Sequence, residues 1–352
     1  MSLFIRAVFA LLLCAAPAMA QDQAAGSPRD DLIGLMETDP AEARRQAEQR
    51  VAQGDAEAAN MLSILLQADV GGPANPERSR ALLERAVAGG SNSARVNLAT
   101  RLLQDPDPVG NSRAVGLLTQ AVEADPEYQR AAAYPFARAY LFGWGVERDM
   151  TRAVGLLKIA VEHAPSNADA RFLLGRAYQN GWGVERDDAR AYGDMRLAAA
   201  LGDPRASWQA GMMLLNGDGV AADPQAAYGL VRSAAEAGHG PAMISNAVML
   251  ALGQGVEPDP AEARTWYLKA AQVGSAHALR GLGAMLVTGE GGEPDVARGL
   301  AYLELAHEGG DDLAATLLAE AFAVQTGRTP RAEIDRIKAE WASTRGKPGP
   351  TV

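Results

Sequence analysis

One short loop returns five times between residues 143 and 292, and it constrains the fold more than any other feature of the chain. The five copies are Gly143-Trp-Gly145-Val146, Gly181-Trp-Gly183-Val184, Gly217-Asp-Gly219-Val220, Gly253-Gln-Gly255-Val256 and Gly289-Glu-Gly291-Gly292. The first two copies are 38 residues apart, and the others follow at intervals of 36. A fixed period of this length is typical of solenoids, in which each unit packs on its neighbours. The glycine pair is therefore predicted to close a structural turn and not to hold a phosphate.

Residues 242 to 275 show what one unit contains. A stripe along one face of a first helix is formed by Ala242, Asn246, Ala247 and Leu250. The glycine loop ends this helix, because glycine reaches positive φ without steric cost. Asp259 then stands where an N-cap belongs and Pro260 where a first helical residue belongs, and the second helix runs to near Gly274. Each unit is therefore predicted to be a helix–turn–helix of about 36 residues.

The same positions recur along the chain. A small residue opens the first helix of eight successive units, at Ala58, Ala94, Ala132, Ala170, Ala206, Ala242, Ala278 and Ala314. Further N-cap candidates are Asn75 and Asp223, each followed by proline. This pattern resembles the Sel-one-like repeat family, a relative of the tetratricopeptide repeats. The residues that match the family pattern include Gly175, Tyr178, Gly181, Gly183, Val184, Asp187, Gly253, Gly255, Val256, Asp259, Trp266, Tyr267, Ala270, Ala271 and Gly274.

The resemblance covers residues 56 to about 311. It implies an all-α, right-handed superhelical solenoid of antiparallel helix pairs, with a concave face lined mainly by the first helix of each pair. In such arrays the concave face is the usual binding surface. Two departures stand out: Asp105-Pro106-Asp107-Pro108 replaces one glycine loop, and Pro135 is expected within the first turn of its helix, where a missing N–H is tolerated.

The limits of the repeats give the domain organisation. We expect a signal peptide at 1–20, a disordered linker at 21–30, an N-terminal capping helix at 31–55, seven repeats at 56–311, a degenerate C-terminal repeat with a capping helix at 312–344, and a disordered tail at 345–352. The capping helix at the C-terminal end is expected to present the polar outer face that the end of a solenoid requires. Its residues are Arg331, Glu333, Arg336, Lys338 and Glu340.

The first twenty residues indicate export. Arg6 supplies a positive start, Ala7 to Ala16 an apolar stretch too short to span a bilayer, and Ala18-Met19-Ala20 a cleavage site of small residues. A lipid anchor on Cys14 is the alternative, although the leucine before it fits that processing poorly. Cleavage after Ala20 removes the chain's single cysteine, so the mature protein can form no disulfide. We expect it in the periplasm of a Gram-negative host, or secreted.

Charge and motifs exclude several classes of function. The formal net charge is −10, and loss of Arg6 makes the mature chain more negative, which disfavours nucleic acid as a partner. The sequence contains no G-x-S-x-G, S-x-x-K or H-E-x-x-H motif and no later apolar segment long enough to cross a membrane. The four histidines, His163, His239, His277 and His307, lack paired ligand spacing. We therefore expect no enzyme, no metal site and no cofactor.

Two candidate surfaces lie on the first helices of the repeats. Arg138 and Arg176 occupy one repeat position, Arg95 and Arg171 another, and Arg101 lies nearby. These arginines could bind carboxylates of a partner, because guanidinium pairs with them bidentately, or they could form a solvated face. Methionines spaced by 36 residues could bind an apolar partner or could pack in the core; they are Met213, Met249 and Met285.

Two tryptophans form a third candidate. Trp144 and Trp182 lie in identical loops, where other repeats place Asp218, Gln254 and Glu290, so the fold does not require an aromatic residue there. They could form an exposed hot-spot pair for a partner, or each ring could cover the adjacent turn.

We therefore expect a non-enzymatic adaptor or regulator of the cell envelope that binds an envelope or secreted protein or peptide. The alternative is a protein that binds a carbohydrate or a peptidoglycan fragment, for which aromatic rings over a groove would be expected. A cell-wall-related hydrolase, suggested by some relatives of the family, is the weakest interpretation, because the serine–lysine dyad of penicillin-recognising enzymes and the relatives' disulfides are missing.

The export prediction is tested on the protein's own N-terminus. The apolar stretch and the small residues at Ala18 and Ala20 predict that the exported protein begins at Gln21. N-terminal sequencing of material from the envelope fraction measures this. Retention of Met1 in the cytoplasmic fraction would contradict export.

Overall fold

The computed structural model describes residues 28–325 and 330–344, and throughout these residues the ordered structure is helical. The expected signal peptide, most of the expected linker and the tail from residue 345 lie outside the described residues. The chain divides into two compact units, of which the first ends at Asp187 and the second begins at Asp188. The all-α solenoid predicted from the period is confirmed, with helix pairs that follow one another in contact.

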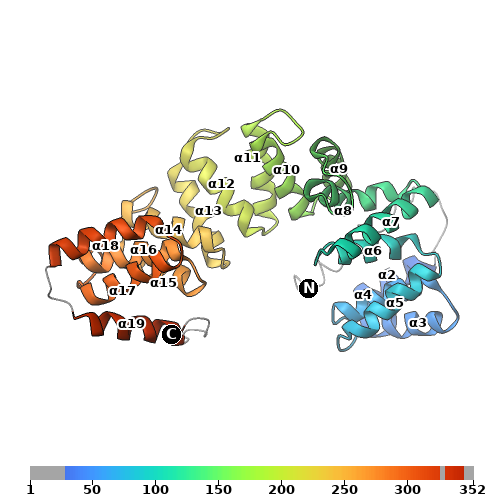
Figure 1. Ribbon diagram of the computed structural model, residues 1–352. Helices are drawn as coiled ribbons and strands as arrows, with labels where there is room; N and C mark the ends of the chain where they lie inside the picture. Colours follow the sequence, from blue (N-terminus) through green and yellow to red (C-terminus); the bar gives the residue numbers. More distant parts are fainter. Residues whose placement is uncertain (1–27, 326–329, 345–352) are drawn as a thin grey trace. The chain divides into compact units, whose positions relative to one another are not determined.

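From residue 28 onward, the first unit contains nine helices (Figure 1). They are α2 (Pro28–Thr38), α3 (Pro40–Ala52), α4 (Ala56–Gln67), α5 (Pro76–Ala88), α6 (Asn92–Leu102), α7 (Pro108–Ala124), α8 (Tyr128–Phe142), α9 (Met150–His163) and α10 (Ala168–Asn180). Helices α4 and α5, α6 and α7, and α8 and α9 form hairpins, and each hairpin packs on the next. The first helix of each hairpin is called helix A below and the second helix B; α10 is a helix A that packs on α9.

The second unit also contains nine helices among the described residues (Figure 1). They are α11 (Asp188–Ala200), α12 (Pro204–Asn216), α13 (Pro224–Glu236), α14 (Gly240–Leu252), α15 (Pro260–Gln272), α16 (Ala276–Thr288), α17 (Val296–Glu308), α18 (Asp312–Gln325) and α19 (Arg331–Thr344). Helices α12 and α13, α14 and α15, and α16 and α17 form the hairpins.

Local sequence signals fix where the helices begin and how they pack. The side chains of Asn75, Asp223 and Asp259 accept hydrogen bonds from backbone N–H groups in the first turns of α5, α13 and α15, as predicted. The eight alanines that open the successive A helices are all buried, each at most 1% exposed. A small side chain there lets neighbouring helices approach closely, so this repeat position is the centre of the packing between repeats.

The two glycines of each loop have different tasks. The first glycine, such as Gly181, ends helix A in the left-handed conformation with φ near 68°, and its N–H donates to the carbonyl of Ala177. The second glycine, such as Gly183, also has positive φ, and a methyl group on it would lie only 2.3 Å from the carbonyl carbon of Met150, the first residue of the preceding helix B. The structural prediction for the loop is confirmed, because the second glycine leaves room for the backbone of the neighbouring repeat.

This close approach recurs in both units. A methyl group on Gly145 would lie 2.5 Å from the carbonyl oxygen of Asn111, and one on Gly219 would lie 2.2 Å from the carbonyl carbon of Asp188. The remaining loops repeat it, since Gly255 meets Pro224 and Gly291 meets Pro260 in the same way. Each loop therefore rests on the first turn of the helix B before it.

Two expectations need correction. Pro135 was expected in a first turn, but α8 begins at Tyr128, so Pro135 lies inside the helix and is buried. Its ring removes one backbone N–H from the helix, and packing of the surrounding α8 residues keeps the helix continuous. The capping element before residue 56 is also two helices and not one: α2 packs on α3 through the buried side chains of Leu32 and Met36.

The C-terminal cap is a single helix, α19, that packs on α17. Its inner face buries Ile334, Ile337 and Trp341, and the Trp341 ring meets Tyr302 of α17 edge-on at 5.1 Å between centroids. This apolar face anchors the last helix of the second unit.

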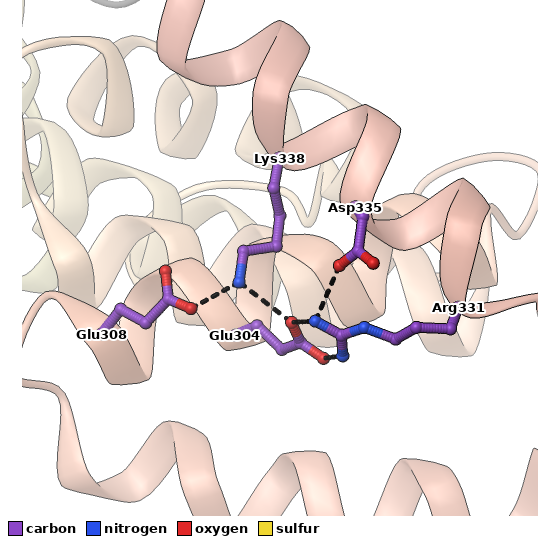
Figure 2. Close-up of polar contacts among 5 residues, drawn as sticks. All are labelled: Glu304, Glu308, Arg331, Asp335 and Lys338. Atoms are coloured by element: carbon purple, nitrogen blue, oxygen red, sulfur yellow. Dashed lines mark hydrogen bonds and ion pairs between the residues drawn. The ribbon is translucent and has the colours of Figure 1, made fainter.

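A cluster of charges joins the same two helices (Figure 2). Glu304 of α17 accepts hydrogen bonds from Lys338 at 3.0 Å and from Arg331 at 3.0 Å, and Lys338 also pairs with Glu308. Arg331 reaches Asp335 of its own helix at 2.8 Å. Burial lowers the pKa of Lys338, but hydrogen bonds to Glu308 and Glu304 outweigh it, so its pKa is raised overall. Lys338 was expected on the outer face; its side chain is only 17% exposed and serves the packing contact.

A matched pair of variants can separate two contributions to stability at Gly183: the close contact with Met150 and the backbone strain at positive φ. Gly181 and Gly183 have nearly equal φ values, 68° and 65°, but nothing lies closer than 3.6 Å to a methyl group on Gly181. Gly183→Ala is expected to destabilise the protein by about 1–3 kcal/mol more than Gly181→Ala, because it also forces the two repeats apart. Urea unfolding measures the difference, and equal losses in the two variants would contradict the contact.

Glu304 is expected to hold α19 in place. Glu304→Gln removes the charge that Lys338 and Arg331 share, so local opening of α19 should become easier by about 1–2 kcal/mol. Amide hydrogen exchange in α19 measures this. Glu308→Gln is the control, and its effect should be smaller because the Glu308 side chain is 56% exposed. Unchanged exchange in the Glu304 variant would show that the apolar face alone anchors the helix.

Candidate functional site

The methionine candidates are part of the core. Met213 and Met249 are 1% exposed and Met285 is 5% exposed. Met249 packs with Leu214, Ala227 and Val231. Side chains buried in this way offer no surface to a partner, so the structure corrects their assignment as binding residues and supports core packing.

Three of the arginines are held by nearby polar groups. Arg95 donates to the carbonyl of Gly90 at 3.3 Å and to the Asn92 side chain, and Arg171 donates through Nε to the carbonyl of Pro165 at 2.8 Å. Both tie a helix A to the turn that precedes it. Arg101 donates to Ser79 at 3.1 Å, and burial lowers its pKa. The side chains of Arg95, Arg101 and Arg171 are therefore engaged by groups of the protein itself.

Arg138 and Arg176 each pair with the tryptophan of their own loop. The guanidinium carbon of Arg138 lies 5.0 Å from the ring centroid of Trp144, and that of Arg176 lies 5.5 Å from that of Trp182. The left-handed glycine at the end of each helix A turns the chain back, so the loop tryptophan reaches the last turns of the helix. A cation over an aromatic face contributes roughly 0.5–1 kcal/mol at a partly exposed site. The sequence patterns predicted these residues as separate features, although the constant interval of six residues between arginine and tryptophan was a usable signal.

The two guanidinium groups keep free hydrogen-bonding capacity. Within the described parts of the chain neither Arg138 nor Arg176 forms an ion pair or a side-chain hydrogen bond, and Nε of Arg176 is buried without a partner. Arg280 shows the opposite arrangement, since it pairs at 2.8 Å with the buried carboxylate of Asp311. The guanidinium groups are thus oriented by stacking, and their terminal N–H groups can still donate to an acceptor.

Both indoles are half-buried, so each ring is partly packed and also presents part of its surface. Trp144 packs against the core of the preceding repeats and lies 4.6 Å, between centroids, from Phe142. Phe142 is 51% exposed although it is large and apolar. Phe142 was not predicted as a site residue because its position at the end of a helix A carries no motif.

A cavity of about 200 Å³ lies beside Phe142, between the α8–α9 hairpin and α10. It is lined by Leu141, Phe142, Arg148, Met150, Leu173 and Trp182. The Arg–Trp pairs and this cavity together form the candidate site, which lies wholly in the first unit.

No metal centre accompanies the site. In residues 28–325 and 330–344 no three histidine, cysteine or carboxylate side chains gather closely enough to hold an ion. The His239 ring instead lies tilted against Trp208, 5.4 Å away between centroids, and burial lowers the pKa of His239. None of the helices within these residues has the length and apolar character that a membrane crossing requires.

The fold is that of a helical repeat protein built from successive helix hairpins. The Sel1 repeat family model matches residues 56–91, 127–164, 168–203, 204–239, 242–275 and 276–311. These matches cover more than half of the chain, and the chain belongs to the Sel1 repeat family. Residues 92–126 are not matched, which agrees with the Asp-Pro sequence that replaces their glycine loop, although α6 and α7 still form a hairpin.

Solved structures support the same fold. A protective antigen of uropathogenic Escherichia coli with an SLR fold matches with a TM-score of 0.67 and 22% identity, over 91% of this chain and 72% of that chain. A Sel1 repeat protein from Oxalobacter formigenes matches with a TM-score of 0.56 and 26% identity, over 71% of this chain and 98% of that chain. No curated protein matches the sequence. Solenoids of this kind are typical scaffolds for protein–protein interaction.

Proposed function

We propose that this protein is an exported, non-enzymatic adaptor or regulator of the cell envelope that binds an acidic segment of a protein partner. The binding surface is formed by helices α8 and α10 with their loops, and Arg138 and Arg176 contact the partner's carboxylates. The observation that carries the proposal is the pair of stacked guanidinium groups without an ion pair among the described residues.

Stacking makes these arginines suitable for recognition. A free arginine side chain loses rotamer freedom when it binds, and an indole that already holds the guanidinium reduces that loss. The N–H groups at the edge of the guanidinium plane can still form two parallel hydrogen bonds with one carboxylate. The two pairs lie on helices A of successive repeats, so one extended segment can contact both.

The local charge supports an acidic partner despite the negative charge of the whole chain. Long-range repulsion between two acidic proteins is screened beyond about 10 Å at 0.1 M salt, whereas contact pairs act at short range. A carbohydrate partner fits less well, because a sugar stacks on open aromatic faces and the guanidinium groups here occupy a face of each indole. The place in the cell envelope rests on the N-terminal export signal, which lies outside the described residues.

The proposal is tested by charge reversal at the two stacked arginines. The variant with Arg138→Glu and Arg176→Glu is expected to capture its partner from envelope extract at least about ten-fold less efficiently, since two charge contacts become repulsive. Capture by the wild type should also weaken as salt is added. Quantitative mass spectrometry of the captured proteins, together with the melting temperature of each variant, measures both effects.

The matched control reverses two arginines outside α8, α10 and their loops. Arg80 of α5 and Arg196 of α11 are exposed, and among the described residues neither forms an ion pair. Arg80→Glu with Arg196→Glu changes the net charge equally and should leave capture intact. An equal loss of capture in the two double variants would show that only the net charge matters. Capture that is insensitive to salt and survives reversal at Arg138 and Arg176 would rule out the proposed surface.

A further inference from the structure

The cavity beside the Arg–Trp pairs has walls from two successive repeats. Leu141, Phe142, Arg148 and Met150 come from the α8–α9 hairpin, and Leu173 and Trp182 come from α10 and its loop. The close approach of Gly183 to the Met150 carbonyl fixes these walls, because Trp182 directly precedes Gly183. The cavity is therefore a preformed feature of the junction between repeats, as small binding sites usually are.

The lining is apolar except at Arg148. Five of the six lining residues are aliphatic, aromatic or methionine, and Phe142 places a half-exposed ring at the edge. The volume of about 200 Å³ exceeds the roughly 150 Å³ of an apolar cavity that takes up benzene, so a ring-sized or leucine-sized group fits. Arg148 has no ion pair or hydrogen bond among the described residues, and its charge is available beside the cavity.

The repeat fold does not require an apolar residue such as Phe142 together with a loop tryptophan such as Trp182. At the position of Phe142 the following repeats carry Asn180, Asn216, Leu252 and Thr288, and the loops after Trp182 lack tryptophan. A large apolar residue at the end of one helix A, followed by a loop tryptophan in the next repeat, occurs at this junction. A feature that packing does not explain is a reason to look for a binding role.

We propose that this cavity binds one bulky apolar side chain of the partner segment, directly next to the carboxylates that Arg176 and Arg148 contact. This rests on the proposed function and adds to it the partner's sequence class: a linear peptide segment with an aromatic or large aliphatic anchor flanked by acidic residues.

The geometry couples the anchor to the acidic positions. Trp182 is both a wall of the cavity and the ring on which Arg176 stacks, with the guanidinium carbon 5.5 Å from its centroid. An extended peptide advances about 3.3 Å per residue, so a carboxylate within roughly two residues of the anchor reaches Arg176. The charge complementarity of Arg148 and Arg176 therefore selects an acidic segment over a purely apolar one, such as a lipid chain.

The probe is a phage-displayed library of random linear peptides, selected on the mature wild-type protein and on its variants. Wild type should enrich peptides with a bulky apolar residue next to acidic residues. Phe142→Ser removes one wall and should lose the apolar preference but keep the acidic one. Leu252→Ser, at the equivalent position of a later repeat and also exposed, is the matched control and should behave as wild type.

Affinity gives the second measurement. A fluorescein-labelled peptide chosen from the wild-type selection should bind the Phe142→Ser variant at least about ten-fold more weakly, because burial of one large apolar side chain changes affinity by roughly one to two decades. The melting temperature should hardly change, since Phe142 is 51% exposed. The peptide with alanine at its apolar position should bind both proteins equally weakly.

The outcomes separate the two proposals. Enrichment of acidic peptides without an apolar anchor, lost on reversal of Arg138 and Arg176, would overturn the cavity's role and leave the proposed function standing. Enrichment of apolar peptides with no acidic preference would overturn both the acidic partner and the coupling to Arg176. An apolar preference that persists in Phe142→Ser, or no enrichment at all on wild type, would overturn the present inference.

Discussion

The approach of one glycine to one backbone carbonyl determines how the repeats stack. A methyl group on Gly183 would overlap the carbonyl of Met150, so no side chain fits at this position. Gly219 is equally close to the carbonyl of Asp188. A loop in this position contacts the first turn of the preceding helix B and so sets the spacing of the repeats. The buried alanine at the start of each helix A allows neighbouring helices to approach closely. Helix packing and the loop contact can therefore form at the same spacing of the repeats.

The same constraint gives the candidate site its geometry. A loop held against the neighbouring repeat presents its second residue in a defined direction, and in two loops that residue is Trp144 or Trp182. The tryptophans in turn orient Arg138 and Arg176. The candidate residues therefore lie in or beside loops whose positions are fixed by contact with the neighbouring repeat. This is the arrangement by which rigid scaffolds usually present binding loops.

The parts of the fold that depend on local rules could be predicted from the sequence. Glycine conformation, the N-caps at Asn75, Asp223 and Asp259, and the alanine position follow from backbone sterics and short-range hydrogen bonds, and all were predicted. Pro135 could not be placed, because its position depends on where α8 begins, and tertiary packing decides that. The extra helix α2 lacks a repeat signature and was missed for a similar reason.

The candidate site was predictable only in part. Residue type and repeat position suggested Arg138, Arg176 and the two tryptophans, but not that they pair, because pairing requires the path of the loop in space. Two further outcomes depend on where a side chain points. Met213 is buried in the core, and Arg171 donates through Nε to the carbonyl of Pro165. Phe142 and the cavity depend on the junction of two repeats, which no single repeat pattern describes.

The unequal repeat spacing shows where this architecture tolerates change in length. The five glycine loops each contain seven residues, as in 143–149 and 217–223, because every one must end at the same distance from the preceding helix. The two additional residues between Gly143 and Gly181 instead lengthen α9 by one residue and the turn at 164–167 by another. Insertions, whether acquired in evolution or engineered, should therefore accumulate in the turns between helix B and the next helix A, on the edge opposite the glycine loops. A reporter or affinity tag inserted at such a turn would leave the contacts of the glycine loops undisturbed.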